Sequence, residues 1–281
     1  MERRDFLNLL GAGVVAAATS VLAANLVPRL LDTAQPLVPT RLHALGAGGN
    51  RLQVPPVMPT IIPPSFAAPT GIVRVRVPYG TIYGLPGTGN LMALTVDDGN
   101  SSAVVREYVA FAQRTGMRLT FFVTGNRPSW AENAQAMQPL IDSGQIQVAN
   151  HTWSHPSLLE IDDAAVIGEL QQNDNFLWNT YGMRGSPYFR PPFGKHDARV
   201  DALAASIGYT TPVLWYGTLS DSGEITPEQL VTFADQWILP EHIVIGHANF
   251  PAVTQCFDHI AELIVTRQIQ PVTLDDLYTR A

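Results

Sequence analysis

Hydrophobic residues follow two different periods along the chain. Short runs that are apolar throughout predict buried strands, and longer stretches with an apolar residue every three to four positions predict amphipathic helices. Strands are expected at 91–96, 119–123, 146–149, 188–189, 212–215 and 243–245. Helices are expected at about 101–116, 131–141, 162–181, 200–207, 227–237 and 257–267. Strict alternation at Val73, Val75 and Val77 predicts one more strand with a solvent-facing side.

Strands that alternate with helices predict an α/β fold around a parallel sheet or barrel. Folds of this kind place their reactive groups at the carboxyl ends of the strands. The residues found at those ends are Asp97, Asp98, His151, Arg190 and His247. We therefore expect these five side chains to share one site.

The first 24 residues have the features of a targeting segment. Arg3 and Arg4 precede a Phe-Leu pair and an apolar run rich in Ala and Gly, which resembles a twin-arginine export signal. The alternative is an uncleaved membrane anchor, since the run is long enough to span a bilayer. In either case the rest of the chain is expected in the periplasm, in the cell wall or secreted. Membrane contact is then expected only through this segment, if it is retained.

Residues 25–70 are rich in proline and predict a spacer without regular structure. Such a spacer either extends away from the folded part or runs along its surface. The folded domain is expected at 71–281.

Composition narrows the function. The formal charge of −7 and the isoelectric point near 5.4 give no indication of nucleic-acid binding. Cys256 is the only cysteine, so an intrachain disulfide and a thiolate metal cage are both excluded. Its helical surroundings predict an inert, buried thiol.

Two short motifs carry the chemistry: residues 95–99, Thr-Val-Asp-Asp-Gly, and residues 150–155, Asn-His-Thr-Trp-Ser-His. One carboxylate and two imidazoles make a three-ligand set for a divalent metal with an open coordination position. The second carboxylate is then free to act as a base on water. A solvated turn is the alternative for the Asp pair taken alone. The two Asp side chains reach one site only if the backbone turns, which Gly99 permits.

The spacing of the two histidines predicts their local structure. In an extended chain, four residues span roughly 13 Å, too far for two ligands of one zinc ion. Pro156 disfavours a helical conformation at His155. A compact loop or a single turn is therefore expected between His151 and His155.

Taken together, these motifs resemble those of the polysaccharide deacetylases of the NodB-homology group, carbohydrate esterase family 4. The first two family motifs match residues 95–99, with Val96 in place of Phe, and residues 150–155. The third matches residues 190–194, Arg-Pro-Pro-Phe-Gly, and the last matches the apolar run that ends at His247. The resemblance implies a distorted (β/α) barrel of the polysaccharide deacetylase type.

The resemblance also implies a role for each residue of the metal site. Asp98, His151 and His155 would hold a divalent metal, with zinc expected and cobalt or nickel also suited to this ligand set. Asp97 would be the general base and Arg190 would orient it.

The leaving-group side is implied in the same way. His247 would protonate the leaving amine, and Asp221 would raise the pKa of His247. Asp221 occupies the position of the family's Asp-Trp motif, but Ser222 replaces the Trp, which puts the substrate range in doubt.

The substrate-binding residues implied by the motifs are Pro192, Phe193, Trp215 and Ile245. A backbone N–H near Phe193 would stabilise the oxyanion. Further aromatic residues that could stack on sugar rings are Trp130, Trp153 and Trp237, with core packing favoured for Trp237.

These assignments predict an exported, metal-dependent hydrolase that removes acetyl groups from N-acetylated glycans. Peptidoglycan or a related N-acetylglucosamine polymer is the expected substrate and partner. One alternative is an O-acetyl esterase acting on xylan, or a hydrolase of non-sugar amides. An alternative of another class is an inactive glycan-binding protein of the cell envelope.

Overall fold

The computed structural model describes residues 65–87 and 89–280. The predicted targeting segment and most of the predicted spacer, residues 25–64, lie outside the described residues. None of the described helices is both long and apolar enough to cross a membrane.

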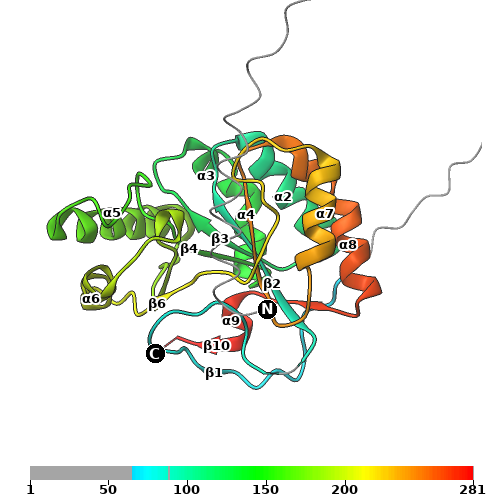
Figure 1. Ribbon diagram of the computed structural model, residues 1–281, viewed down its shortest axis with the longest axis horizontal. Helices are drawn as coiled ribbons and strands as arrows, with labels where there is room; N and C mark the ends of the chain where they lie inside the picture. Colours follow the sequence, from blue (N-terminus) through cyan, green and yellow to red (C-terminus); the bar gives the residue numbers. More distant parts are fainter. Residues whose placement is uncertain (1–64, 88, 281) are drawn as a thin grey trace, which may run out of the picture. The chain divides into compact units, whose positions relative to one another are not determined.

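A parallel sheet forms the centre of the described fold (Figure 1). Its central strands are β2 (Leu91–Asp98), β3 (Leu119–Val123) and β4 (Ile146–Asn150). The outer strands are β5 (Tyr188–Phe189), β6 (Thr211–Pro212), β7 (Gly217–Thr218), β8 (Ile243–His247) and β9 (Gln270–Pro271). The order is β6-β5-β4-β3-β2-β8-β7, and β9 pairs with the start of β2. The sheet is therefore the parallel α/β sheet predicted from the alternating pattern.

The two edges of the sheet approach each other because the chain passes directly from one edge strand to the other. Residue Val213 donates to Phe189 O of β5 at 2.8 Å, and Tyr216 donates to Ile243 O of β8 at 3.0 Å. The expected single strand at 212–215 is therefore wrong. It is replaced by β6 and β7, since the chain changes its partner strand between them.

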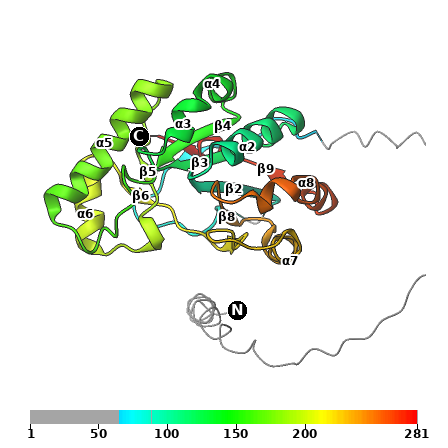
Figure 2. The same ribbon diagram turned by 90° about the horizontal axis from the view of Figure 1, so that it is seen from above.

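A segment from the amino-terminal side, residues 77–85, spans the remaining gap. Ile82 donates to Pro212 O at 2.9 Å and accepts from Leu214 N at 2.8 Å, while Leu85 donates to Glu241 O at 2.8 Å. This segment therefore forms hydrogen bonds both to the chain beside β6 and to the chain before β8. The result is a curled sheet that approximates the predicted distorted barrel (Figure 2).

Helices cover the outer face of the sheet. They are α2 (Ser102–Thr115), α3 (Pro128–Glu132), α4 (Ala134–Asp142), α5 (Asp163–Tyr181), α6 (Ala198–Ser206), α7 (Pro227–Trp237) and α8 (Phe257–Thr266). The short α9 (Leu274–Leu277) instead packs against the inner side of the sheet, where Leu274 and Leu277 share a core with Phe122. Helix α2 begins and ends as predicted: Ser101 accepts from Val104 N at its start, and Gly116 has φ +73° at its end.

The helix expected at 131–141 is instead two helices. Asn133 separates α3 from α4 with φ −100° and ψ 1°. Its side chain donates to Ser129 O at 2.8 Å and to Ser102 O at 3.2 Å. These contacts bind the junction to the start of α2, so the chain changes direction there.

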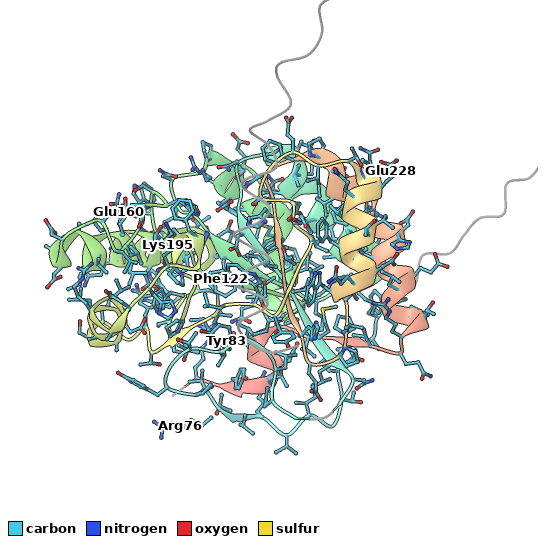
Figure 3. All side chains as sticks on the ribbon, in the orientation of Figure 1. Arg76, Tyr83, Phe122, Glu160, Lys195 and Glu228 are labelled. Atoms are coloured by element: carbon cyan, nitrogen blue, oxygen red, sulfur yellow. The ribbon has the colours of Figure 1, made fainter. Side chains whose placement is uncertain are left out.

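Alternate residues of the central strands enter two different cores. Phe121 belongs to the outer core with α2, α4 and α8, whereas Phe122, labelled in Figure 3, belongs to the inner core of the curled sheet. Because both faces are buried, these strands appear in the sequence as continuous apolar runs. Cys256 lies buried in the outer core, and burial raises the pKa of its thiol, in agreement with the predicted inert role.

The alternating valines near residue 75 form less structure than predicted. Strand β1 (Val75–Arg76) has only two residues and pairs in parallel with β10 (Tyr278–Thr279). Val73 and Val75 are 85% and 46% exposed, and only Val77 is buried. The strand lies at the surface outside the main sheet, so Val73 and Val75 have no core to pack against.

Candidate functional site

The predicted site residues meet at the carboxyl ends of neighbouring strands. In the register of β2 with β8, Asp97 lies opposite His247. In the register of β3, Asp98 pairs with Val123, which in turn pairs with Asn150 at the end of β4. Sheet order alone therefore brings Asp97, His247 and the loop that carries His151 to one edge.

Three of these residues form a cluster with metal-binding geometry. Asp98 Oδ1 lies 3.3 Å from His151 Nε2 and 3.3 Å from His155 Nε2, and the three ligand atoms lie within 4.8 Å of one another. Ligand atoms about 2.1 Å from a tetrahedral zinc ion lie roughly 3.4 Å apart. Asp98 Oδ1 is buried and accepts no hydrogen bond from any described residue. The cluster thus fits a divalent metal.

The turn that lets both carboxylates face one site begins at Asp98. Asp98 has φ +71° and Gly99 has φ +92°, so the backbone leaves the strand one residue before the glycine that was expected to permit the turn. Asp97 Oδ2 lies 3.5 Å from His151 Nε2, beside the cluster. A Cβ on Gly99 would lie 2.4 Å from the Trp130 indole, whose Nε1 donates to Asp98 O at 2.8 Å.

A compact loop joins the two histidines, as the spacing predicts. Thr152 and His155 have φ +68° and +65°, and the imidazole centroids are 4.8 Å apart. His151 Nδ1 lies 2.7 Å from Arg190 O. Because a carbonyl only accepts, this bond places the proton on Nδ1 and leaves Nε2 of His151 with a free lone pair toward Asp98.

The local electrostatics favour the metal-ligand form at His155 and Asp98. At His151, by contrast, burial lowers the pKa, but the charges of Asp97 and Asp98 outweigh it and raise that pKa. Burial and the neighbouring His151 lower the pKa of His155 to about 4, so its imidazole is neutral near pH 7. Burial opposes ionisation of Asp98, but the adjacent imidazoles of His151, His247 and His155 hold the pKa of Asp98 well below its usual range. An ionised carboxylate and neutral imidazoles are the ligand forms.

Arg190 fixes Asp97. Its guanidinium is fully buried and donates to Asp97 Oδ1 at 2.6 Å, to Thr95 Oγ1 at 2.9 Å and to Val213 O at 2.8 Å. The Phe122 ring packs 4.0 Å from the guanidinium carbon. With Oδ1 engaged by Arg190, Oδ2 is the oxygen that Asp97 presents to the cluster.

His247 is paired with Asp221. His247 Nδ1 lies 3.0 Å from Asp221 Oδ1, and the backbone N of His247 donates to Asp221 Oδ2 at 3.2 Å. Burial alone would lower the pKa of His247. The bond and charge of Asp221, aided by Asp97 and Asp98, instead raise that pKa to about 9. His247 is therefore protonated at neutral pH, and Nε2 remains as its second ring nitrogen.

Of the predicted substrate-binding residues, Phe193 is the one with a described contact to this cluster. Phe193, with φ +60°, is 61% exposed, and its ring centroid lies 4.7 Å from that of His155. Pro192 is buried at the start of the same turn. Ile245 is buried two residues before His247, so both point to the same side of β8. Trp215 lies 5.6 Å from the Arg190 guanidinium.

The prediction that Trp130 could stack on a sugar ring is wrong. Trp130 is fully buried and packs on Phe121, so it cannot stack on a sugar.

One neighbour of the metal cluster, Asn249, lies outside the predicted set of site residues. Asn249 donates to Asp98 Oδ2 at 2.6 Å and accepts from Asn100 N at 3.2 Å. Its only signal in the sequence is its place two residues after His247, at the same strand end.

Comparison with known proteins agrees with the motifs. Residues 85–212 match the family model described as polysaccharide deacetylase. Over 126 residues, the chain is 35% identical to chitin deacetylase 1 of Cryptococcus neoformans var. grubii, covering 45% of this chain and 26% of that protein. Over 201 residues, it is 27% identical to the peptidoglycan-N-acetylglucosamine deacetylase PgdA of Listeria monocytogenes, covering 68% of this chain and 39% of that protein. The aligned part thus spans less than half of either relative.

The fold also matches solved structures. A pseudoenzyme of carbohydrate esterase family 4 from Bacillus anthracis superposes with a TM-score of 0.63 at 18% identity, covering 73% of this chain and 70% of that one. Likeness at this level of identity concerns the fold. Because this neighbour is a pseudoenzyme, the shared fold by itself gives no indication of activity.

Proposed function

We propose that this chain, whose residues 85–212 belong to the polysaccharide deacetylase family, is a metal-dependent hydrolase that removes acetyl groups from N-acetylated glycans. The observation that carries the proposal is the arrangement of Asp97 and His247 beside the Asp98–His151–His155 cluster. A ligand set that lies beside both a base and a protonated imidazole suits amide hydrolysis.

Asp98, His151 and His155 would hold the ion. A divalent metal bound there supplies Lewis acidity, which brings the pKa of water to about 7 and polarises a carbonyl oxygen.

The remaining steps belong to the residues around the ion. Asp97 accepts a proton from the attacking water through Oδ2, because Arg190 occupies Oδ1. Asp221 stabilises His247 as an imidazolium before the transfer, and as the amide C–N bond breaks, His247 donates the proton of Nε2 to the departing amine nitrogen and becomes neutral. A backbone N–H near Phe193 would assist the oxyanion.

The substrate class follows from the relatives. Proteins named as deacetylases of chitin and of peptidoglycan N-acetylglucosamine support an N-acetylglucosamine polymer as the substrate. The exposed Phe193 ring beside His155 offers a stacking surface for a sugar. Export through the amino-terminal segment is part of the proposal and rests on the sequence of residues 1–24 alone.

Acetate release tests the proposal. The purified chain, loaded with Zn²⁺, is incubated with chitooligosaccharides, peptidoglycan and acetylxylan, with a chelator-treated sample as the control. We expect acetate from an N-acetylated glycan and its loss on chelation. Acetate from acetylxylan alone would favour an esterase. No acetate from any substrate, with Zn²⁺ bound, would indicate an inactive glycan-binding protein.

A further inference from the structure

Asn150, the last residue of β4, organises the loop that carries both histidines. Its buried side chain makes four hydrogen bonds. Asn150 Oδ1 accepts from Thr152 N and from Asn173 Nδ2, each at 2.8 Å. Asn150 Nδ2 donates to Leu170 O at 2.9 Å and to Tyr209 Oη at 2.8 Å. The loop is therefore tied through Asn150 to α5 and to Tyr209.

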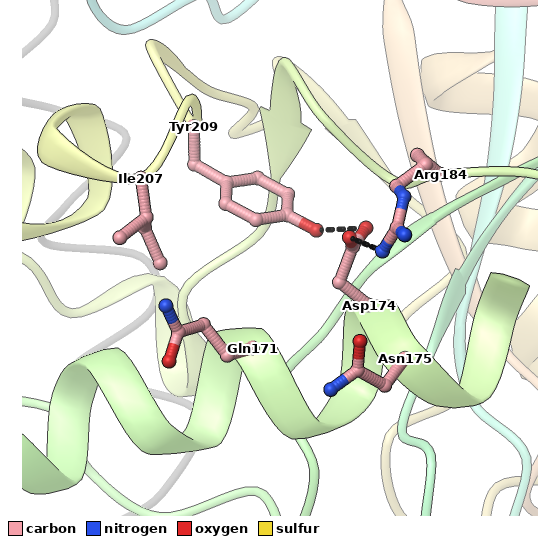
Figure 4. Close-up of a pocket in the computed structure, with 6 residues that line it drawn as sticks. All are labelled: Gln171, Asp174, Asn175, Arg184, Ile207 and Tyr209. Carbon is pink, nitrogen blue, oxygen red and sulfur yellow. Dashed lines mark hydrogen bonds and ion pairs between the residues drawn. The ribbon is translucent and has the colours of Figure 1, made fainter.

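Tyr209 is in turn held by Asp174 of α5. Tyr209 Oη lies 2.6 Å from Asp174 Oδ1, and Arg184 donates to Asp174 Oδ2 at 2.7 Å. Figure 4 shows these three side chains at a pocket of about 400 Å³. This end of the network thus lies between α5 and residues 207–209, and none of the three is a proposed metal ligand.

The hydrogen-bond directions along this network are fixed by Asp174. A carboxylate only accepts, so the Tyr209 proton is committed to Asp174, and the Tyr209 oxygen accepts from Asn150 Nδ2. The amide of Asn150 must then present Oδ1 to Thr152 N. If the amide were reversed, the donor Nδ2 of Asn150 would face two other donors, Thr152 N and Asn173 Nδ2.

The backbone held by Asn150 is one that needs support. Thr152 is β-branched and has φ +68°, a conformation that such residues rarely adopt. Residues in sparsely populated conformations persist where their surroundings over-determine them. Thr152 also connects to the second histidine, because its Oγ1 accepts from His155 N at 3.1 Å. The bond from Thr152 N to Asn150 therefore bears on both His151 and His155.

We propose that the Tyr209 hydroxyl, held by Asp174, is a positioning group for the metal-ligand loop. Through Asn150 and Thr152 it fixes His151 and His155 in the geometry that a divalent ion requires. The inference rests on the proposed function for the metal-binding role of those histidines. It adds two residues, Tyr209 and Asp174, that lie outside the Asp98–His151–His155 cluster and that no motif identifies.

Zn²⁺ affinity tests this role without relying on activity. Zn²⁺ is titrated into the full chain in competition with a chromophoric chelator, for wild type and Tyr209→Phe. Substitution of residues that orient metal ligands typically weakens metal affinity by about 10- to 100-fold. We expect a loss of this size for Tyr209→Phe. Tyr278→Phe, which removes the hydroxyl of a buried tyrosine in β10, is the matched control and should leave affinity unchanged.

Thermal unfolding without metal separates positioning from folding. A lowered melting temperature with unchanged Zn²⁺ affinity in Tyr209→Phe would overturn the inference, because the hydroxyl would then support only the fold. If Tyr209→Phe does not fold, the same Zn²⁺ titration is done with Asp174→Asn. We expect this variant to bind Zn²⁺ more weakly as well. A wild-type chain that binds no Zn²⁺ would contradict the proposed function itself, whereas equal affinities contradict the positioning role alone.

Discussion

Asp97 and Asp98 are neighbours in sequence, yet their surroundings differ. Asp97 Oδ1 faces the buried guanidinium of Arg190, while Asp98 Oδ2 accepts from the amide of Asn249 and Asp98 Oδ1 faces two imidazoles. Two carboxylates placed in different environments can take different roles. Here the difference supports a base at Asp97 and a ligand at Asp98.

Replacing Asp97 separates the two roles. We expect Asp97→Asn to retain the metal, because the Asp98–His151–His155 cluster is intact, and to lower kcat by about 10²- to 10⁴-fold through loss of the base. Elemental analysis and acetate release measure the two effects. Asp98→Asn is the matched comparison and should lose metal as well as activity. Unchanged turnover in Asp97→Asn would rule out its role as the base.

The pKa of His247 sets the alkaline limit of activity. Only protonated His247 can donate, so kcat/KM should fall as the pH rises through the pKa of His247, which lies at about 9 in the metal-free protein. Because Asp221 supplies the main upward influence, Asp221→Asn should move this limit to lower pH by about 1 to 3 units. A pH profile of kcat/KM measures the shift. An unchanged alkaline limb would show that another group controls it.

At the scale of elements, the sequence predicts best where local signals agree with burial. The apolar runs of β2, β3 and β4 are buried on both faces, and the helix starts at Ser101 and Thr226 have side-chain caps. In these elements, periodicity and termination point to the same structure. The elements that differ from the prediction are those decided by distant contacts, such as the α3–α4 junction at Asn133.

The candidate site shows the same division. Its motif residues follow strands whose carboxyl ends meet, so the meeting of Asp97, Asp98, His151 and His247 could be predicted. The supporting residues could not be predicted. Tyr209 and Asn249 gain their roles from contacts across 59 and 151 residues of sequence, and neither stands in a recognisable pattern.

The turn after β2 depends on its glycine more than the turn after α5 does. Both Gly99 and Gly182, which follows α5, have a left-handed backbone, with φ +92° and +68°. In Gly99→Ala the new Cβ would also clash with the Trp130 ring, whereas no described atom lies within 4 Å of the Cβ position at Gly182. We expect Gly182→Ala to lower the free energy of unfolding by about 1 kcal/mol. Gly99→Ala should lose about 1–3 kcal/mol more through overpacking. Urea unfolding compares them. Equal losses would mean that Trp130 moves aside freely.

At the scale of the whole molecule, the metal cluster exists only in the folded chain. Its ligands lie on β2 and on the loop after β4, and the strand between them must be in register for the cluster to form. Metal binding and folding are therefore linked, since an unfolded chain does not hold the ligands together.

This linkage predicts a measurable stabilisation. Zn²⁺ at 100 times its dissociation constant should raise the free energy of unfolding by about 2.7 kcal/mol. For a domain of this size the melting temperature should rise by about 5 to 10 °C. His151→Ala should remove this rise. A melting temperature that does not respond to Zn²⁺ in the wild-type chain would show that the cluster does not bind the ion under these conditions.

The pairing of β1 with β10 has a consequence for how the chain can be connected. The two strands run in parallel, with Val75 beside Tyr278 and Arg76 beside Thr279, so residue 280 emerges a few residues from the start of β1. Because the pair is parallel, a linker from residue 280 to residue 71 would have to run back beside the exposed β1, a length of roughly six extended residues, and would stay outside the core. The domain is thus a good subject for circular permutation, in which strand order in space is kept while the order of synthesis changes.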